Sequence, residues 1–148
     1  MPHAMEVIKQ LKDMGIKTAV CSNSNTPLKR IKVLESLGFN IEGLFDAFIV
    51  SGDYGVRKPN PDLIQIVKDK FPEIQNHEMF IIGDQIDRDI ACGHLAGIRS
   101  VFFAYRPYNP AANYKAFALG EHPDFSILDF RQLPYILEIM NHDVKFIE

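Results

Sequence analysis

The sequence lacks the features that mark several specialised classes of protein. No apolar run approaches the roughly 18 residues of a membrane span, and the 16 Lys and Arg do not outnumber the 19 Asp and Glu. Only two cysteines occur, Cys21 and Cys92, each within an apolar stretch. These absences argue against a membrane protein, a nucleic-acid binder, a disulfide framework and a cysteine metal site. We therefore expect buried, reduced thiols in a cytoplasmic protein with no membrane or nucleic-acid partner.

The first residues lack the marks of a targeting segment, and no strand precedes the first predicted helix. They contain neither a basic region nor an apolar core of the signal-peptide type. Instead, Met5, Val7, Ile8, Leu11 and Met14 recur at helical spacing. We expect the protein to be neither secreted nor anchored, and we expect a segment upstream of this helix to be missing from the domain.

The bulk composition is that of an ordinary globular protein. Of the 148 residues, 47% are apolar and 24% are charged, and the net charge is -3. A globule of this length buries roughly 68 to 70% of the surface that its unfolded chain exposes. The sequence thus predicts one domain over residues 1–148, incomplete at its N-terminus.

Strand and helix patterns alternate along the chain. The predicted strands cover residues 17–21, 47–50, 79–82, 100–103 and 125–128. Predicted helices start at Pro27 with Thr26 as N-cap, at Asn60-Pro61 and at Ile90, and a last one covers residues 133–140. Glycine-rich residues 52–55 and polar residues 84–89 are predicted loops, and residues 105–122 are predicted as a surface loop with one short helical turn.

This alternation predicts an α/β fold, a three-layer Rossmann-like parallel sheet with helices on both faces. Functional groups in such folds gather where the strands end. Three strand ends carry polar residues of chemical interest here.

The most informative of them is Ile81-Ile82-Gly83-Asp84-Gln85-Ile86-Asp87-Arg88-Asp89-Ile90. Asp84 comes directly after a predicted buried strand, where a charge without a partner costs free energy. It would supply a carboxylate oxygen to Mg²⁺, a hard ion that takes few protein carboxylates. Asp89 would orient the ligands around this ion or orient Lys58. Alternatively, Asp87 or Asp89 only caps the following helix.

Two further clusters suit phosphate. Lys58, before a proline-started helix, could place its ammonium over a phosphate, although a loop lysine is usually only solvated. Ser22 and Asn23 offer a hydroxyl, an amide and backbone N–H groups to phosphate oxygens. Ser-Asn-Ser-Asn is equally a generic turn.

The order of these clusters resembles the haloacid dehalogenase (HAD) superfamily of hydrolases over about residues 1–140. The matching segments are Ser22-Asn23, Arg57-Lys58-Pro59-x-Pro61, Gly83-Asp84-x4-Asp89-Ile90, Gly93 and Ala96-Gly97-Ile98. The resemblance implies catalytic roles for Ser22, which binds the phosphoryl group, and for Lys58, which stabilises charge. It also implies that Asp84 and Asp89 hold Mg²⁺, as in the phosphatases of the superfamily and unlike its metal-free dehalogenases.

The sequence departs from this family at its first motif. Family members carry an Asp-x-Asp after a central strand, which supplies the aspartate that becomes phosphorylated and an acid-base aspartate. Here the only Asp-x-Asp is Asp87-Arg88-Asp89, inside the fourth motif. The missing strand would lie between the strands that end at Ser22 and Asp84. We expect these two strands to close on one another, or a partner or second copy to supply a strand, or the chain to be a fragment.

Two functions follow as expectations. The first is a Mg²⁺-dependent phosphatase of a small phosphorylated metabolite that works through an aspartyl-phosphate, with this chain inactive by itself. The alternative is a non-catalytic relative that binds a phosphorylated ligand or a protein. A receiver domain fits poorly, because its acidic pair precedes its lysine. The substrate cannot be read from Arg106, Tyr108 and Lys115, and the five histidines show no ligand spacing.

Overall fold

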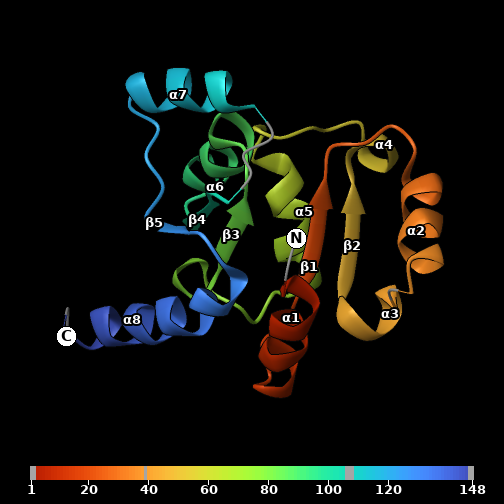
Figure 1. Ribbon diagram of the computed structural model, residues 1–148, viewed down its shortest axis with the longest axis horizontal. Coiled ribbons are helices and arrows are strands. Elements are labelled where there is room, and N and C mark those ends of the chain that lie inside the picture. Colours follow the sequence, from red (N-terminus) through yellow and green to blue (C-terminus); the bar gives the residue numbers. More distant parts are fainter. Residues whose placement is uncertain (1–2, 39, 106–108, 147–148) are drawn as a thin grey trace.

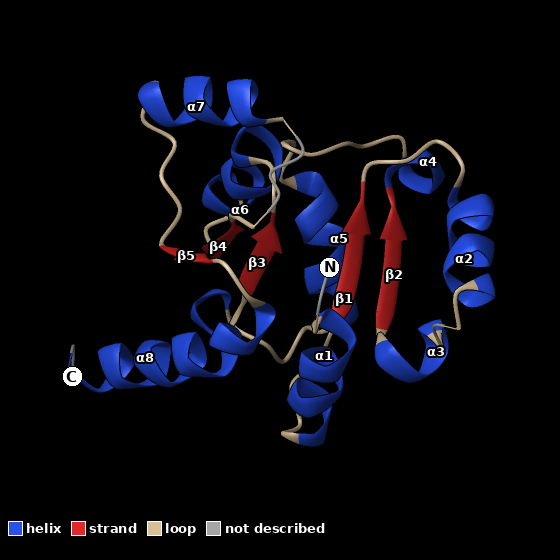
Figure 2. Cartoon of the chain, in the orientation of Figure 1, coloured by secondary structure: helices blue, strands red, loops and turns tan. Residues whose placement is uncertain are grey.

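The strand pairs that the structure describes are all parallel, as the alternating pattern predicts (Figures 1 and 2). The computed structural model describes residues 3–38, 40–105 and 109–146. The strands are β1 (Ala19–Ser22), β2 (Ala47–Val50), β3 (Phe80–Gly83), β4 (Arg99–Phe103) and β5 (Phe125–Ile127). The α-helices are α1 (Ala4–Asp13), α2 (Pro27–Ser36), α3 (Ile41–Leu44), α4 (Ser51–Tyr54), α5 (Asp62–Lys70), α6 (Ala91–Leu95), α7 (Pro110–Ala118) and α8 (Leu133–Phe146). Two 3₁₀-helices, η1 (Asn76–Glu78) and η3 (Phe130–Gln132), and one π-helix, η2 (Ile86–Ile90), complete the elements.

The strands form two sheets. β1 pairs with β2, with Ala19 opposite Ala47. The second sheet has the order β3-β4-β5, with Phe80 opposite Arg99 and Val101 opposite Phe125. Within the residues that the structure describes, no ladder joins β1 to β3. The two strands therefore do not close directly on one another, which was one of the three arrangements expected for a domain without the central strand.

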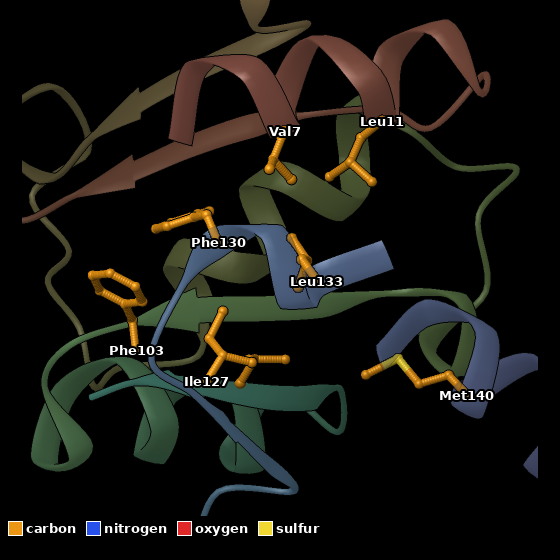
Figure 3. Packing of buried hydrophobic residues seen from close by; sticks show 8 residues of the cluster. Val7, Leu11, Phe103, Ile127, Phe130, Leu133 and Met140 are labelled. Atoms are coloured by element: carbon orange, nitrogen blue, oxygen red, sulfur yellow. The ribbon is translucent and has the colours of Figure 1, made fainter. Parts of the chain in front are cut away.

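One face of the three-stranded sheet is covered by α1, η3 and α8. Figure 3 shows Val7 and Leu11 of α1 pointing toward Phe130 and Leu133, above the strands that carry Phe103 and Ile127. Side chains alternate along a strand, so Phe80 and Ile82 of β3 also pack on this face. Burying one such aliphatic or aromatic side chain contributes roughly 1.5 to 3 kcal/mol, which makes this cluster the main support of the sheet.

The opposite face is covered by α5 and α6. Ile64 of α5 packs with Ile81 of β3 and Cys92 of α6. Leu63 and Val67 of the same helix pack with Ile49 of β2. Because α5 contacts both clusters, it holds the two sheets side by side, although no backbone ladder joins them among the described residues.

The structure confirms the predicted α/β class with helices on both faces of parallel strands. Cys21 and Cys92 are free thiols, and burial raises the pKa of each to about 11. Over the described ranges, none of the helices combines the length and the apolar character that crossing a membrane requires.

Three predicted loops contain helix instead. Residues 84–89 were predicted as a loop, but η2 begins at Ile86. Residues 52–55 lie largely in the short helix α4. In residues 105–122, the nine-residue helix α7 replaces the single expected turn. Its start carries the same signal as the other helices, because Asn109 precedes a proline at the first turn and its side chain accepts a hydrogen bond from the backbone N–H of Ala112 at 3.1 Å. Arg106 and Tyr108 lie outside the described residues.

Candidate active site

The predicted site residues meet at one edge of the molecule because the strands before them are parallel. Ser22 is the last residue of β1, and Asp84 follows the last residue of β3. Figure 2 shows the arrowheads of β1 and β3 at the same end. Lys58 enters from the segment between α4 and α5, and Asp89 from η2.

Lys58 links the two sheets at this edge. Its Nζ donates to the backbone carbonyl of Cys21 in β1 at 2.8 Å and to Oδ1 of Asp89 at 2.5 Å. The side chains of Lys58 and Asp89 are only 12% and 5% exposed. A buried ion pair of this kind must be well hydrogen-bonded to persist, since each charge has left water. Lys58 is therefore a fixed charge and not the solvated loop lysine of the alternative interpretation.

Asn23 holds the backbone of Lys58. Its Oδ1 accepts from the backbone N–H of Lys58 at 2.9 Å, and its Nδ2 donates to the carbonyl of Lys58 at 3.0 Å. This pair of bonds fixes both position and orientation of the lysine backbone. The predicted contact of Asn23 with phosphate stays a prediction.

The turn after Ser22 is also anchored, in a way that the sequence did not reveal. Ser51, only 2% exposed, accepts a hydrogen bond from the backbone N–H of Ser24 at 3.0 Å and donates to the Ser24 carbonyl at 3.2 Å. A Cβ at Gly52 would lie 2.7 Å from that carbonyl oxygen, so a side chain there would push the two segments apart. The Ser-Asn-Ser-Asn stretch is thus a turn held in one conformation beside Lys58.

Asp89 folds back under the loop that carries Asp84. Its Oδ2 accepts from the backbone N–H of Gln85 at 3.1 Å, while Oδ1 accepts from Lys58. A Cβ at Gly83 would overlap the Asp89 carboxylate, so the glycine of the Gly-Asp motif makes room for this close approach. Asp89 does not cap α6, whose N-cap residue is Ile90 and has no side-chain cap. A direct bond from Asp89 to a metal stays a prediction.

Asp84 is half-buried and is the more exposed member of the acidic pair. Its carboxylate accepts no hydrogen bond from the side chain of another residue in the described part of the chain. Partial desolvation, and secondly the nearby charge of Asp89, raise the pKa of Asp84 above its ordinary value. A bound cation would relieve both effects.

The donor set at this edge fits Mg²⁺. No group of three or more His, Cys, Asp or Glu side chains that could enclose a metal occurs among residues 3–38, 40–105 and 109–146. Mg²⁺ does not require such a cage, because it is usually held by one or two carboxylates together with waters and phosphate oxygens. Asp84, beside the fixed Lys58–Asp89 pair, offers that kind of open site.

A groove elsewhere on the molecule holds none of the predicted site residues. It has a volume of about 750 Å³, and its lining includes His77, His94, Arg99 and Asp124. These residues precede or begin β3, β4 and β5, whereas the site residues follow strand ends. The groove is therefore separate from the cluster around Lys58.

Comparison with known proteins places the chain among hydrolases. A family model described as haloacid dehalogenase-like hydrolase matches residues 1–97. The glyceraldehyde 3-phosphate phosphatase of Pyrococcus furiosus is 27% identical over 146 residues, which cover 98% of this chain and 57% of the relative. The phosphoserine phosphatase of Thermus thermophilus is 26% identical over 134 residues, 89% of this chain and 49% of the relative. The chain thus spans about half the length of these two curated relatives.

A solved structure shows the same fold. The HAD-hydrolase YfnB of Bacillus subtilis, crystallised bound to magnesium, superposes with a TM-score of 0.73 at 23% identity. The match covers 93% of this chain and 55% of YfnB.

Proposed function

Because the chain belongs to the haloacid dehalogenase-like hydrolases, we propose that it carries the phosphate- and metal-binding half of a Mg²⁺-dependent phosphatase site. The observation that carries this proposal is the buried Lys58–Asp89 pair beside the half-buried Asp84 carboxylate, which no other side chain of the described residues binds by a hydrogen bond. The names of the relatives support a small phosphorylated metabolite as substrate, since glyceraldehyde 3-phosphate and phosphoserine are both of that class.

Each residue has a distinct role in this proposal. Lys58 presents a fixed ammonium that offsets the charge of the phosphoryl oxygens. Ser22, at the end of β1, donates its hydroxyl to one of those oxygens. Asp84 holds Mg²⁺, with Asp89 either a second ligand or the group that orients Lys58. When bound, Mg²⁺ stabilises the negative charge that develops on the transferring phosphoryl group.

The proposed reaction passes through an aspartyl-phosphate, and its nucleophile is not among the residues of this site. The one Asp-x-Asp of the 148 residues lies at Asp87-Arg88-Asp89, within η2 and not after a strand. Loss of a covalent nucleophile from residues that act as a unit costs on the order of a million-fold in turnover. We therefore expect this chain alone to bind phosphate and Mg²⁺ without turning substrate over.

The sheet arrangement is consistent with a nucleophile strand supplied from outside these residues. β1 pairs only with β2, and β3 pairs only with β4, in the part of the chain described. A parallel strand between β1 and β3 would end beside Lys58 and Asp84. It could come from a longer form of the protein, from a second copy or from a partner.

A complementation assay tests the proposed function. A peptide with an apolar strand ending in Asp-x-Asp is added to the purified chain with Mg²⁺, and hydrolysis of glyceraldehyde 3-phosphate and phosphoserine is followed. We expect turnover only when both are present, and none with a peptide whose first Asp is Asn. Robust turnover by the chain alone, abolished in Asp84→Ala, would show that the inactivity expectation is wrong.

The alternative function is a module that binds a phosphorylated ligand or a protein without catalysis. The buried Lys58–Asp89 pair and the neighbouring Asp84 carboxylate would serve such binding equally well. Mg²⁺-dependent binding of inorganic phosphate, with no turnover under any complementation, would support this module against the phosphatase. Absence of both metal and phosphate binding would exclude the phosphatase and a module that binds a phosphorylated ligand.

A further inference from the structure

Asn113 of α7 reaches from a distant part of the sequence into the loop that carries Asp84. It is a polar side chain within a helix, yet it is only 5% exposed. Its Oδ1 accepts a hydrogen bond from the backbone N–H of Ile86 at 2.7 Å, and its Nδ2 donates to the backbone carbonyl of Asp84 at 2.9 Å. One side chain thus binds the backbone on both sides of Gln85.

These contacts fix the peptide plane next to Asp84. The Asp84 carbonyl and the Gln85 N–H belong to the same peptide group. Asn113 binds its oxygen, and Asp89 binds its N–H at 3.1 Å. On the other side of Asp84, the ladder between β3 and β4 holds Gly83 opposite Phe102. With both flanking peptides held, the direction in which the Asp84 side chain leaves the backbone is determined.

The chemistry requires an amide. The amide of Asn carries a donor and an acceptor on one carbon in a short planar group, and this position uses both. A leucine of similar shape would leave the Ile86 N–H and the Asp84 carbonyl without partners in a buried place. An aspartate would turn a second acceptor toward the Asp84 carbonyl and add a third negative charge beside Asp84 and Asp89.

Apolar packing holds Asn113 in register with the loop. Ala116, one helical turn further along α7, packs with Ile86 and Ile90 of η2. Residues three apart lie on the same face of a helix. The face of α7 that covers η2 therefore contributes a nonspecific apolar contact at Ala116 and a directional one at Asn113.

We infer that Asn113 is the positioning residue that aims the Asp84 carboxylate at the metal, an inference that rests on the proposed metal site. It does not touch phosphate or Mg²⁺ and acts through the backbone of the loop. Groups that orient a metal ligand in this manner typically account for 10- to 100-fold in metal affinity.

The experiment measures Mg²⁺ affinity by titration calorimetry, and Mn²⁺ binding by electron paramagnetic resonance, on the full chain. The variants are Asn113→Leu, Asn113→Ala, Asp84→Asn and the control Asn109→Ala. Asn113→Ala leaves room for water to bind the two freed backbone groups, so it folds even if Asn113→Leu does not. The Asn109 side chain caps the same helix through the backbone N–H of Ala112, and in the described structure it makes no hydrogen bond to the loop that carries Asp84, so its variant loosens α7 without removing a contact to that loop.

The expected result is a loss of roughly 10-fold or more in Mg²⁺ and Mn²⁺ affinity in both Asn113 variants. Asn109→Ala should bind both ions as the unmodified chain does, even where its melting temperature falls as far. Amide exchange at Ile86 should accelerate in the Asn113 variants alone, because that N–H loses its acceptor.

Two outcomes overturn the inference and can be told apart. If the unmodified chain binds Mg²⁺, Asp84→Asn abolishes binding and the Asn113 variants bind normally, the positioning role fails while the proposed site stands. If the unmodified chain binds neither ion, the proposed metal site fails and the role of Asn113 with it.

Discussion

The two sheets differ in how well they are buried, and the candidate site lies between them. In the three-stranded sheet, β4 has three of its five residues buried, and eight buried residues form the cluster beneath it. In the two-stranded sheet, β2 has three of its four residues buried, but β1, the strand that leads to the site, has none, and the cluster around Ile49 holds three buried residues. Asp84 and Asp89 follow β3 of the three-stranded sheet, which we call the stable side. Ser22 and Asn23 lie at the end of β1, in the two-stranded sheet.

This contrast explains why Lys58 is held so firmly. Its side chain binds Cys21 on one sheet and Asp89 beside the other, and its backbone is bound by Asn23. With no backbone ladder between β1 and β3 in the described structure, these polar bonds and the helix α5 join the two sides at the site edge. The geometry of the site therefore depends on a junction and not on one sheet.

Removing the Lys58 side chain, which joins the two sheets at the site, should have the largest effect on the free energy of unfolding. In Lys58→Met, the buried Asp89 carboxylate loses its cation, and we expect a loss of about 3 to 5 kcal/mol in the free energy of unfolding. Urea denaturation followed by circular dichroism measures it. The exposed pair of Lys12 and Asp46, 3.2 Å apart, is the control, and Lys12→Met should cost about 1 kcal/mol or less. Equal losses in the two variants would show that Lys58 is not a structural junction.

The difference between the sheets should appear in native-state hydrogen exchange. Two-stranded sheets are marginal without further packing. We expect the opening free energy of the β1 amides to be at least about 1.4 kcal/mol lower than that of the β4 amides, which corresponds to a tenfold faster exchange. The measurement is residue-resolved exchange by NMR at a pH where closing is fast. Equal protection of β1 and β4 would contradict the contrast.

A smaller effect is expected at the start of α8, on the stable side. Arg131 pairs with Asp129 at 2.7 Å and holds the pKa of that carboxyl at about 2, below its ordinary value. The stabilisation that this ion pair gives the folded state is fully present above about pH 3.9, the pKa of an Asp in the unfolded chain. It is lost as the pH falls to about 2. Asp129 also accepts from the backbone N–H of Arg131 as the N-cap residue of η3. Asp129→Asn should lower the melting temperature by about 2 °C at pH 7.

That difference should vanish below pH 2, and thermal melts at several pH values measure it. Glu73→Gln, at an exposed residue with no partner in the described structure, is the matched control and should leave the melting temperature unchanged at every pH. If the melting temperature of Asp129→Asn differed from that of the unmodified chain by the same amount at every pH, the effect would come from the loss of the cap and not from the ion pair.

The smallest effect should be a stabilisation at the site itself. The pKa of Asp84 is raised by desolvation and by Asp89, so ionising Asp84 opposes folding above its ordinary pKa. In metal-free protein, Asp84→Asn should raise the melting temperature at pH 7 by about 1 °C, and the gain should disappear as the pH falls below about 4. The same variant should lose the stabilisation that added Mg²⁺ gives the unmodified chain. A lower melting temperature in metal-free Asp84→Asn would contradict the assignment.

Much of the fold could be predicted from local patterns. Residues 47–50 were predicted as a strand and form β2, and the proline-started helices at Pro27 and Asn60-Pro61 appear as α2 and α5. The Asn109-Pro110 pair carries the same signal at the start of α7, but the weak apolar periodicity of the residues that follow predicts a loop. The π-helix η2, in which the backbone N–H of Ile90 bonds to the carbonyl of Gln85, has no residue pattern that predicts it.

The sequence by itself determined the class of the fold, the order of the strand ends and the residue types that meet there. Ser22, Lys58 and Asp84 follow from strand patterns, prolines and polar positions that local chemistry specifies. Only the tertiary structure decided what holds them. Asn23 and Asp89 bind Lys58, and Ser51 and Asn113 bind the two loops, across separations of 27 to 35 residues. A single polar residue carries no local pattern that names a distant partner, so such contacts exist only once packing has brought the segments together.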